Sequence, residues 1–516
     1  MNGHSGARIT AGLADVPAQV DVLVVGLGVT GAGVALDAAA RGLSVLAVDA
    51  RDVAFGTSRW SSKLVHGGLR YLASGQVGIA YESAVERGIL LQRTAPHLVR
   101  PMPMLVPLTG NVSTPQAMLT ATGIQAGDLL RMAARTSAHV LPRPRRIPAQ
   151  HALRWVPALR RAGLRGALLY WDGQLEDDAR LVTCLARTAA SRGAVVRTRA
   201  RVTAATGTGA TLRDELTGST LEVTTRAVVN AAGVWAGQLA SDIRLRPSRG
   251  THLVLRGETL PGLGAAFTVP VPGSASRWIF ALPQSDGTVF VGLTDEAVEG
   301  DVPDVPEPTD AEIDFLLDVV SASLEHPLRR GDVVGAFAGL RPLLDAEGHT
   351  ADLSRKHAVV TSPNGVVTVV GGKLTTYRRM AEDAVDATGI TSAPSPTADL
   401  PLLGAAPAGD LVRIDAPARL VRRFGTEAPF VLATARAASG LPDSDLLSPG
   451  PRGVTLAELI FGVTHEGAIS AGDLLDRRTR LGLVPADRDD ALALADRALQ
   501  IAGAHSAFPP PQADGV

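Results

Sequence analysis

The chain has 516 residues, 46% hydrophobic and 20% charged, a composition typical of a soluble globular protein rather than a disordered one. A net charge of −1 gives no basic field for nucleic acid, and the single cysteine, Cys184, excludes an intramolecular disulfide or a multi-thiolate metal site. We expect no signal peptide, no metal centre and no membrane-spanning helix, so that any membrane role would be peripheral.

The first unit along the chain is a strand, a helix and a second strand. Residues 21–26 predict a buried strand, the helix closes at Gly42, and residues 43–50 predict the second strand. The glycines between strand and helix have the spacing G-x-G-x-x-G, which allows a tight turn and a close approach of backbone to a pyrophosphate. An acid at the end of the second strand would bind ribose hydroxyls and repel a 2′-phosphate, which favours FAD or NAD over NADP. These residues are Gly26, Gly28, Gly31 and Asp49.

Farther along, strands and helices alternate. Residues 167–204 predict a loop, a helix and a strand, and residues 226–236 predict a strand that enters a glycine turn. The remaining segments are sheet strands over 251–257, 277–284 and 287–295, a helix over 308–324 capped by Thr309 or Asp310, and a strand, glycine turn and helix over 365–388.

Eight stretches have more specific patterns: DVLVVGLGVTGAGVALDAAARGLSV, TSRWSSKLVHGGLRYL, EDDARLV, VVNAAGVWA, GTHLVL, GLRPLL, GGKLTTYR and HEGAISAGDLLDRRTRLGL. Together they resemble the FAD-dependent, quinone-linked glycerol-3-phosphate dehydrogenases. The resemblance runs from about residue 20 to about residue 500 and is weak over 100–165. The family often has a glutamate where Asp49 stands, and the shorter acid should still reach the ribose.

The resemblance implies an α/β fold in three parts: an FAD-binding Rossmann-type domain (glutathione-reductase-like, DAO-like), a mixed-sheet substrate domain and a helical C-terminal domain. The oxidoreductase region is expected over 18–395, with FAD-binding parts over 18–95, 167–240 and 335–395 and substrate-domain parts over 96–166 and 241–334. A linker over 396–409, the helical domain over 410–505 and a disordered tail over 506–516 follow.

The family's reaction oxidises sn-glycerol 3-phosphate to dihydroxyacetone phosphate, with hydride passing from C2 to flavin N5. A phosphate dianion calls for several cations. By resemblance these are Arg70, Arg341 and Lys373, and Arg355 is a further candidate. The chain has only three lysines among its 50 basic residues, so a lysine inside a motif favours a specific need for a compact ammonium. Tyr71 either donates to a substrate oxygen or packs.

His252 is the candidate general base, because an imidazole titrates near neutral pH; the alternative is an ordinary half-buried strand histidine. The resemblance also places Lys63 on a flavin phosphate or carbonyl, and the helix after the glycine pair 371–372 at the reduced flavin, whose negative charge its N-terminus would stabilise. Besides the first glycines and Asp49, the expected FAD-binding residues are Ser62, Lys63, His66, Gly67, Gly233, Gly371, Gly372 and Thr375.

No second nucleotide fingerprint occurs, which leaves a membrane quinone or oxygen as the electron acceptor rather than NAD. The 131–165 region contains no acid and is basic, with apolar Met132, Trp155 and Leu159 interspersed, a pattern that suits an anionic membrane surface, an ordinary basic face or a patch for another protein. The expected location is cytoplasmic, peripheral on the inner face of the membrane. The arginines are Arg131, Arg135, Arg143, Arg145, Arg146, Arg154, Arg160, Arg161 and Arg165.

Other functions remain open at this stage. A related oxidase would use O₂ and release peroxide, and an amino-acid oxidase would need a carboxylate clamp in place of a phosphate site. A non-catalytic flavin-binding adaptor, acting through the helical domain, would not need to keep a substrate cage. The sequence leaves the oligomeric state open, a homodimer included.

Overall fold

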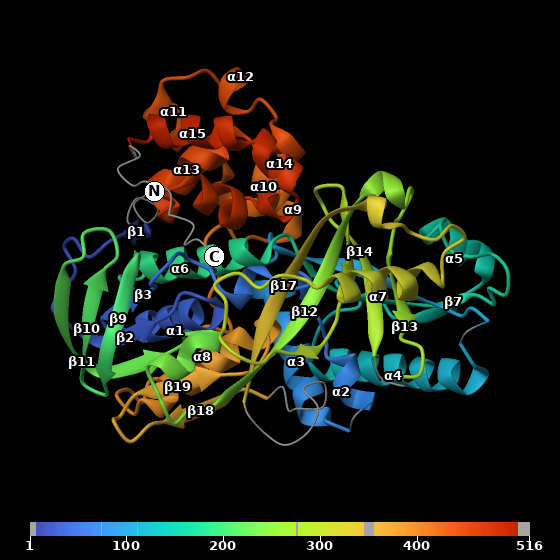
Figure 1. Ribbon diagram of the computed structural model, residues 1–516, viewed down its shortest axis with the longest axis horizontal. Helices are drawn as coiled ribbons and strands as arrows, with labels where there is room; N and C mark the ends of the chain where they lie inside the picture. Colours follow the sequence, from blue (N-terminus) through green and yellow to red (C-terminus); the bar gives the residue numbers. More distant parts are fainter. Residues whose placement is uncertain (1–6, 74, 111, 275–276, 345–355, 504–516) are drawn as a thin grey trace.

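The computed structural model describes residues 7–73, 75–110, 112–274, 277–344 and 356–503. Figure 1 shows three parts: an α/β part, a second part built on long strands beside it, and a layer of C-terminal helices above. The predicted fold class, with its mixed second sheet and helical C-terminal part, is confirmed. Arg355 and the predicted tail over 506–516 lie outside the described residues.

Five parallel strands form the centre of the first sheet, in the order β8–β3–β2–β11–β19. Val25 of β2 pairs with Val48 of β3, so these strands end level with each other, as the sequence predicts. The carboxyl ends of parallel strands share one edge, and there an α/β sheet binds its ligand. The strands of this sheet are β1 (Thr10–Ala11), β2 (Gln19–Val25), β3 (Val45–Val48), β8 (Val195–Thr198), β9 (Ala200–Thr206), β10 (Gly209–Asp214), β11 (Thr220–Asn230), β18 (Ala358–Thr361) and β19 (Val367–Val370).

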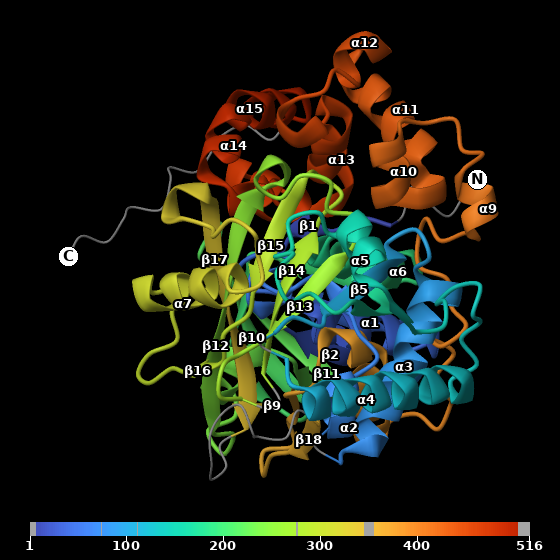
Figure 2. The same cartoon turned by 90° about the vertical axis from the view of Figure 1, so that its right-hand side faces the viewer.

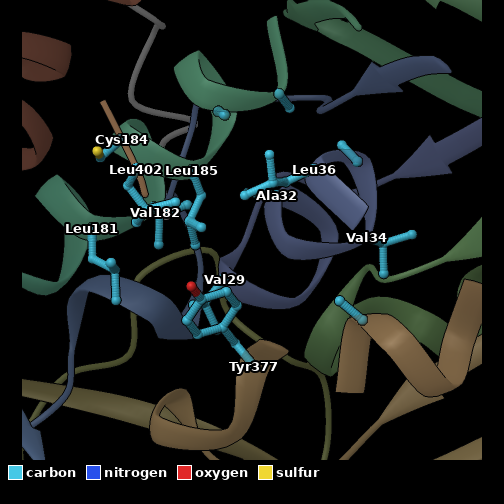
Figure 3. Packing of buried hydrophobic residues seen from close by; sticks show 14 of the residues in the cluster. Val29, Ala32, Val34, Leu36, Leu181, Val182, Cys184, Leu185, Tyr377 and Leu402 are labelled. Atoms are coloured by element: carbon cyan, nitrogen blue, oxygen red, sulfur yellow. The ribbon is translucent and has the colours of Figure 1, made fainter. Parts of the chain in front are cut away.

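The core of the α/β part lies around α1 (Val29–Ala40), which packs against α6 (Asp178–Ser191) and α8 (Tyr377–Ala387). Small residues on α1 allow this close packing. A Cβ on Gly33, for example, would lie 2.9 Å from the Tyr377 ring. Figure 3 shows side chains from all three helices meeting in one cluster, labelled there as Val29, Ala32, Val34 and Leu36 of α1, Leu181, Val182, Cys184 and Leu185 of α6, and Tyr377 and Leu402.

The second sheet is mixed, and its two longest strands are antiparallel neighbours, β12 and β17. Residues 167–175, predicted as a loop, form strand β7 of this sheet. The polar Asp172 does not break the strand because it is buried against Arg87. The strands are β4 (Leu64–Val65), β5 (Val99–Pro107), β6 (Arg145–Ile147), β7 (Ala167–Leu175), β12 (Leu245–Arg256), β13 (Ala266–Pro270), β14 (Trp278–Pro283), β15 (Thr288–Gly292), β16 (Glu296–Ala297) and β17 (Val333–Leu344).

Two segments assigned from the sequence to the FAD-binding parts, 167–175 and 335–344, belong to the second sheet. The helices around that sheet include α7, which Thr309 caps by accepting the Glu312 N–H, one of the two predicted caps. They are α2 (Leu69–Ala73), α3 (Val77–Ile89), α4 (Thr114–Ala133), α5 (Ala149–Trp155) and α7 (Asp310–Ser321).

The C-terminal helices lie over α6 and the edge of the second sheet (Figures 1 and 2). Arg180 and Arg187, both on α6, make buried two-pronged ion pairs with Glu466 and Glu427 of these helices. The helices are α9 (Ala408–Leu411), α10 (Ala418–Phe424), α11 (Ala428–Ser439), α12 (Asp443–Leu446), α13 (Leu456–Glu466), α14 (Pro485–Asp490) and α15 (Leu492–Ile501).

Candidate active site

The turn between β2 and α1 has the shape that a dinucleotide phosphate requires. Gly26 turns the chain with φ of +99°, a conformation that side chains disfavour. A Cβ on Gly31 would lie 1.7 Å from the Gly26 carbonyl oxygen, so the helix approaches the turn closely enough only with glycine there. Gly28 is the N-cap of α1. Ser58, which sequence reasoning missed, accepts the Val29 N–H at 2.9 Å from a distant segment.

Asp49 follows β3 directly and faces this turn. Its Oδ2 accepts the Leu27 N–H at 2.8 Å and its Oδ1 accepts the Arg51 N–H at 2.8 Å. Each carboxylate oxygen retains a second lone pair, so ribose hydroxyls could still bind there. Burial raises the pKa of Asp49 to about 6. Both the glycine turn and Asp49 thus fit a dinucleotide such as FAD.

Two other predicted FAD-binding groups come to the same edge of the sheet. Gly233 begins a short helix after β11, with φ of +59°. Gly371 and Gly372 follow β19 with φ of +76° and +74°, and a Cβ on Gly372 would lie 2.4 Å from the Met380 sulfur. Thr375 is buried in the turn Leu374–Thr376, which leads into α8. Residues distant in sequence therefore meet at the carboxyl ends of β2, β3, β11 and β19.

Lys373 lies with Tyr71 beside α2 and α3. Its Nζ lies 4.0 Å from the centre of the Tyr71 ring and donates to Ser83 Oγ. Tyr71 is buried and stacks on His66, with ring centres 6.4 Å apart. These contacts involve the ring of Tyr71, and donation by its hydroxyl to a substrate oxygen stays a prediction. Arg70 lies in α2, but its side chain is outside the described residues.

Glycine is required at positions 67 and 68 for different reasons. Gly67 lies against the buried pair Arg87–Asp172: its N–H donates to Asp172, and a Cβ on it would lie 2.3 Å from Arg87 Nη1. Gly68 has φ of +76°, and its N–H donates to His66 Nδ1 at 3.2 Å. One glycine makes room for an ion pair, and the other turns the chain.

Arg341 extends from β17 opposite Ser248 of β12. Its guanidinium donates to Ser248 Oγ at 3.1 Å and to the Thr294 carbonyl at 3.2 Å, and lies 3.4 Å from Asp295 Oδ1. A Cβ on Gly250 would lie 2.2 Å from Arg341 Nη2, so this glycine provides the space for the guanidinium.

His252 lies on β12 with its ring stacked on Phe337, 4.8 Å between ring centres. Its Nε2 shares a 2.8 Å hydrogen bond with Ser62 Oγ, and its buried Nδ1 has no hydrogen-bond partner among the described residues. Burial, helped by the nearby charges of Lys63 and Arg341, lowers the pKa of His252 to about 3, so the ring is neutral at neutral pH. Ser62, predicted to contact the cofactor, thus contacts the candidate base.

The structure does not favour the prediction that Lys63 binds the flavin. Its fully buried Nζ donates to Asp178 Oδ2 at 2.9 Å, to the Arg59 carbonyl at 2.7 Å and to the Ser61 carbonyl at 3.4 Å. An ammonium has three N–H groups, and all three are directed at protein oxygens. The compact ammonium of Lys63 therefore serves a buried ion pair with Asp178 rather than the predicted contact with the flavin. Asp178, which the sequence analysis did not single out as a site residue, is its partner.

Comparisons with known proteins cover nearly the whole chain. A family profile described as FAD dependent oxidoreductase matches residues 21–378, and one described as the C-terminal domain of alpha-glycerophosphate oxidase matches residues 395–509. Glycerol-3-phosphate dehydrogenase 1 of Mycobacterium tuberculosis is 52% identical over 502 residues, 95% of this chain and 96% of that protein. Glycerol-3-phosphate dehydrogenase 2 of the same species is 38% identical, over 90% of this chain and 81% of that protein.

Among solved structures, the glycerol-3-phosphate dehydrogenase of Bacillus halodurans complexed with FAD is similar, with a TM-score of 0.69 and 26% identity. The similarity covers 95% of this chain and 96% of that one.

Proposed function

The chain belongs to the FAD-dependent glycerol-3-phosphate dehydrogenase family, and on that premise we propose that it oxidises sn-glycerol 3-phosphate to dihydroxyacetone phosphate and passes the electrons to a membrane quinone. FAD, when bound, accepts the hydride from substrate C2. The residues that would hold FAD are the glycine turn before α1, Asp49, and the glycines at the ends of β11 and β19.

The observation that carries the proposal is a neutral histidine next to a cation. The Nδ1 atom of His252 has no hydrogen-bond partner among the described residues. The charge of Arg341 contributes to the low pKa of the ring. A substrate whose phosphate binds Arg341 would bring an adjacent hydroxyl toward that ring. Burial is the main cause of the low pKa of His252, and the anion would offset the smaller effect of the two nearby cations, which makes the ring a stronger base when substrate is bound.

Lys373 supplies a second cation for the phosphate. It donates to Ser83 and contacts the Tyr71 ring, which stacks on His66. His66 and Ser62 flank the short strand β4 on opposite ends. Arg70 and Arg355 remain predicted phosphate ligands.

The proposed membrane surface combines apolar and basic side chains. Within the described residues, no helix is both long and apolar enough to span a bilayer. Helix α4 instead exposes Met118, Leu119, Leu129 and Met132, and α2, α3 and α4 lie side by side (Figure 2). Exposed Arg135 follows α4, and exposed Arg165 donates to Thr109 and Thr114 at its start.

This surface differs in part from the predicted one over 131–165. Arg131 is buried and paired with Asp128, and Leu159 lies in the core of the second sheet, so neither can contact lipid. The apolar residues that can do so lie earlier, on α4. Peripheral attachment to the inner face of the membrane remains our proposal for its location.

The oxidation is tested by anaerobic mixing of the FAD-loaded protein with glycerol 3-phosphate. We expect the flavin absorbance to bleach with this substrate and to persist with glycerol or glycine. If glycine bleaches the flavin, or if glycerol 3-phosphate does not, the proposed substrate is wrong. Reoxidation by a soluble quinone should then be faster than by air; rapid peroxide release in air would instead indicate an oxidase.

The membrane surface is tested by co-sedimentation with vesicles of phosphatidylglycerol or of phosphatidylcholine. We expect salt-sensitive binding to the anionic vesicles, weakened by Leu119→Gln. Val412, which is 83% exposed on the C-terminal helices, provides the control, since Val412→Gln should leave binding unchanged. Equal binding to both kinds of vesicle would contradict a basic interface.

A further inference from the structure

The acidic run Glu176-Asp177-Asp178 lies at the start of α6, between the C-terminal helices and the segment that carries Ser62. The proposed reaction leaves it without a role, although all three residues are buried. Its two aspartates face opposite partners. Asp177 binds Arg423 of α10, and Asp178 binds Lys63.

On the active-site side, Asp178 holds residues 61–63 through one oxygen. Its Oδ2 accepts the Ser61 N–H at 3.0 Å, the Ser61 hydroxyl at 2.7 Å and the Lys63 ammonium at 2.9 Å. Lys63 has φ of +56°, a backbone conformation that a lysine seldom adopts without such restraint. Ser62 lies between these two residues in the chain, so their contacts restrain the backbone that positions the Ser62 hydroxyl against His252.

On the other side, the C-terminal helices hold the same turn. Arg423 Nη2 donates to Asp177 Oδ2 at 3.1 Å, and Arg480 Nη1 donates to the Glu176 carbonyl at 2.8 Å. Asp177 Oδ1 caps α6 by accepting the Ala179 and Arg180 N–H groups. Two buried acids are therefore neutralised by two buried cations, one from each side.

We propose that Asp178, with Lys63, is a positioning residue that fixes Ser62 against His252, and that Asp177 makes the C-terminal helices part of the same support. The inference rests on the proposed function, because it assigns His252 the role of base. Ser62 holds the ring through Nε2, 2.8 Å away, and proton transfer from a substrate hydroxyl requires a base that is held in one position. The helical C-terminal domain then has a role in catalysis without touching the substrate.

The test compares two single variants and their double variant in the full-length, FAD-loaded protein. Asp178→Asn and Ser62→Ala should each lower kcat at least tenfold, with KM for glycerol 3-phosphate changed less than threefold and FAD content unchanged. In the Ser62→Ala background, Asp178→Asn should cost less than a further twofold, because both act through one hydrogen bond. A double variant whose loss equals the product of the single losses overturns the proposal.

Glu427→Gln is the matched control. It breaks another buried ion pair of α6, Arg187–Glu427, which joins this helix to the C-terminal part and lies far along α6 from Asp178. It should lower Tm about as much as Asp178→Asn while kcat stays within twofold of wild type. An equal loss of kcat in both variants would mean that destabilisation alone explains the effect, and the proposal fails.

If Asp178→Asn does not fold, Ser61→Ala removes one of its hydrogen bonds without a change of charge. It should lower kcat several-fold, again only when Ser62 is present. Asp177→Asn tests the C-terminal side, since asparagine still caps a helix but breaks the ion pair with Arg423. If Asp177→Asn has the kcat of the wild-type protein, the C-terminal helices do not help to position Ser62.

A readout without substrate separates this inference from the proposed function. In the ¹⁵N-histidine spectrum of the substrate-free protein, the Nε2 resonance of His252 should shift in Ser62→Ala and in the same direction in Asp178→Asn, and stay in place in Glu427→Gln. An unmoved resonance in Asp178→Asn overturns the inference. If glycerol 3-phosphate fails to bleach the wild-type flavin while these shifts occur, the proposed function fails but the support of Ser62 holds.

Discussion

At the scale of single residues, burial decides which side chains carry charge. Arg341 forms an ion pair with Asp295 and donates to Ser248, whereas burial, helped by two nearby cations, keeps the His252 ring neutral. His97 shows the same effect without a catalytic role: both ring nitrogens are buried without a hydrogen-bond partner among the described residues, and burial lowers its pKa to about 3.

Replacing Arg341 should weaken substrate binding. A charge-assisted hydrogen bond contributes about 1.5–3 kcal/mol, so Arg341→Met should raise KM for glycerol 3-phosphate about tenfold or more while FAD stays bound. Steady-state kinetics and flavin absorbance measure both quantities. Arg330→Met, at an exposed arginine paired with Asp310 and Asp314, should leave KM unchanged. An unchanged KM in Arg341→Met would remove this residue from the phosphate site.

His97 should make the protein sensitive to acid. Above pH 6.5 the ring is neutral in the folded and unfolded chain, so it has no effect on stability. As pH falls from 6.5 toward 3, the unfolded chain binds a proton that the folded ring cannot accept, and the free energy of unfolding decreases. In thermal melts, the Tm of His97→Leu should therefore decrease less between pH 7.5 and pH 5 than the Tm of the wild-type protein. The exposed His139, changed to Leu, should behave as wild type.

At the scale of elements, the candidate site side chains depend on glycines in the neighbouring strand or turn. Gly292 of β15 pairs with His252, and a Cβ there would lie 2.3 Å from the histidine Cδ2. Gly250 leaves room for Arg341 in the same way, and Gly31 lets α1 approach the phosphate turn. Glycine is needed at each of these positions because a group from a neighbouring strand or turn lies against it. The requirement becomes visible only once the tertiary structure shows which groups are neighbours.

Gly31→Ala should abolish FAD binding. The added methyl would overlap the Gly26 carbonyl oxygen, so either the turn or α1 must move away from the phosphate position. Flavin content of the purified variant is the measurement. Gly123→Ala is the control, because a Cβ at Gly123 of α4 meets nothing within 4 Å. Retention of stoichiometric FAD in Gly31→Ala would show that the turn can rearrange.

At the scale of the whole molecule, buried ion pairs join the C-terminal helices to the rest of the chain. Besides the pairs on α6, the buried Asp52 accepts hydrogen bonds from both Arg477 and Arg478. Such pairs need not stabilise more than apolar contacts would, but each partner alone would be a costly buried charge. The C-terminal helices therefore cannot separate from the α/β part without exposing these charges to water.

Calorimetry of the FAD-loaded protein should accordingly give one unfolding transition rather than two. Glu427→Gln leaves Arg187 buried without its charge partner, at a cost of about 3–5 kcal/mol, and should lower Tm by several degrees while the transition stays single. Two separate transitions in the wild-type protein would contradict the coupling of the two parts.

Much of the fold and part of the site can be predicted from sequence, because their signals are local. The period of apolar residues places β2, α1 and β3, and the glycine spacing and Asp49 place the dinucleotide turn. The prediction of a loop over 167–175 is wrong for the converse reason: Asp172 looks like a loop residue until Arg87, from another helix, neutralises it.

The sequence by itself thus determined the β-α-β unit, the phosphate turn, the family and the residue types available for an anionic substrate. Only the tertiary structure decided that Lys63 pairs with Asp178, that Ser62 contacts His252, and that the C-terminal helices bind α6. The physical reason is that the state of a charged or polar side chain depends on burial and on its nearest partner. For these residues the partner is 115 to 246 positions away in the chain.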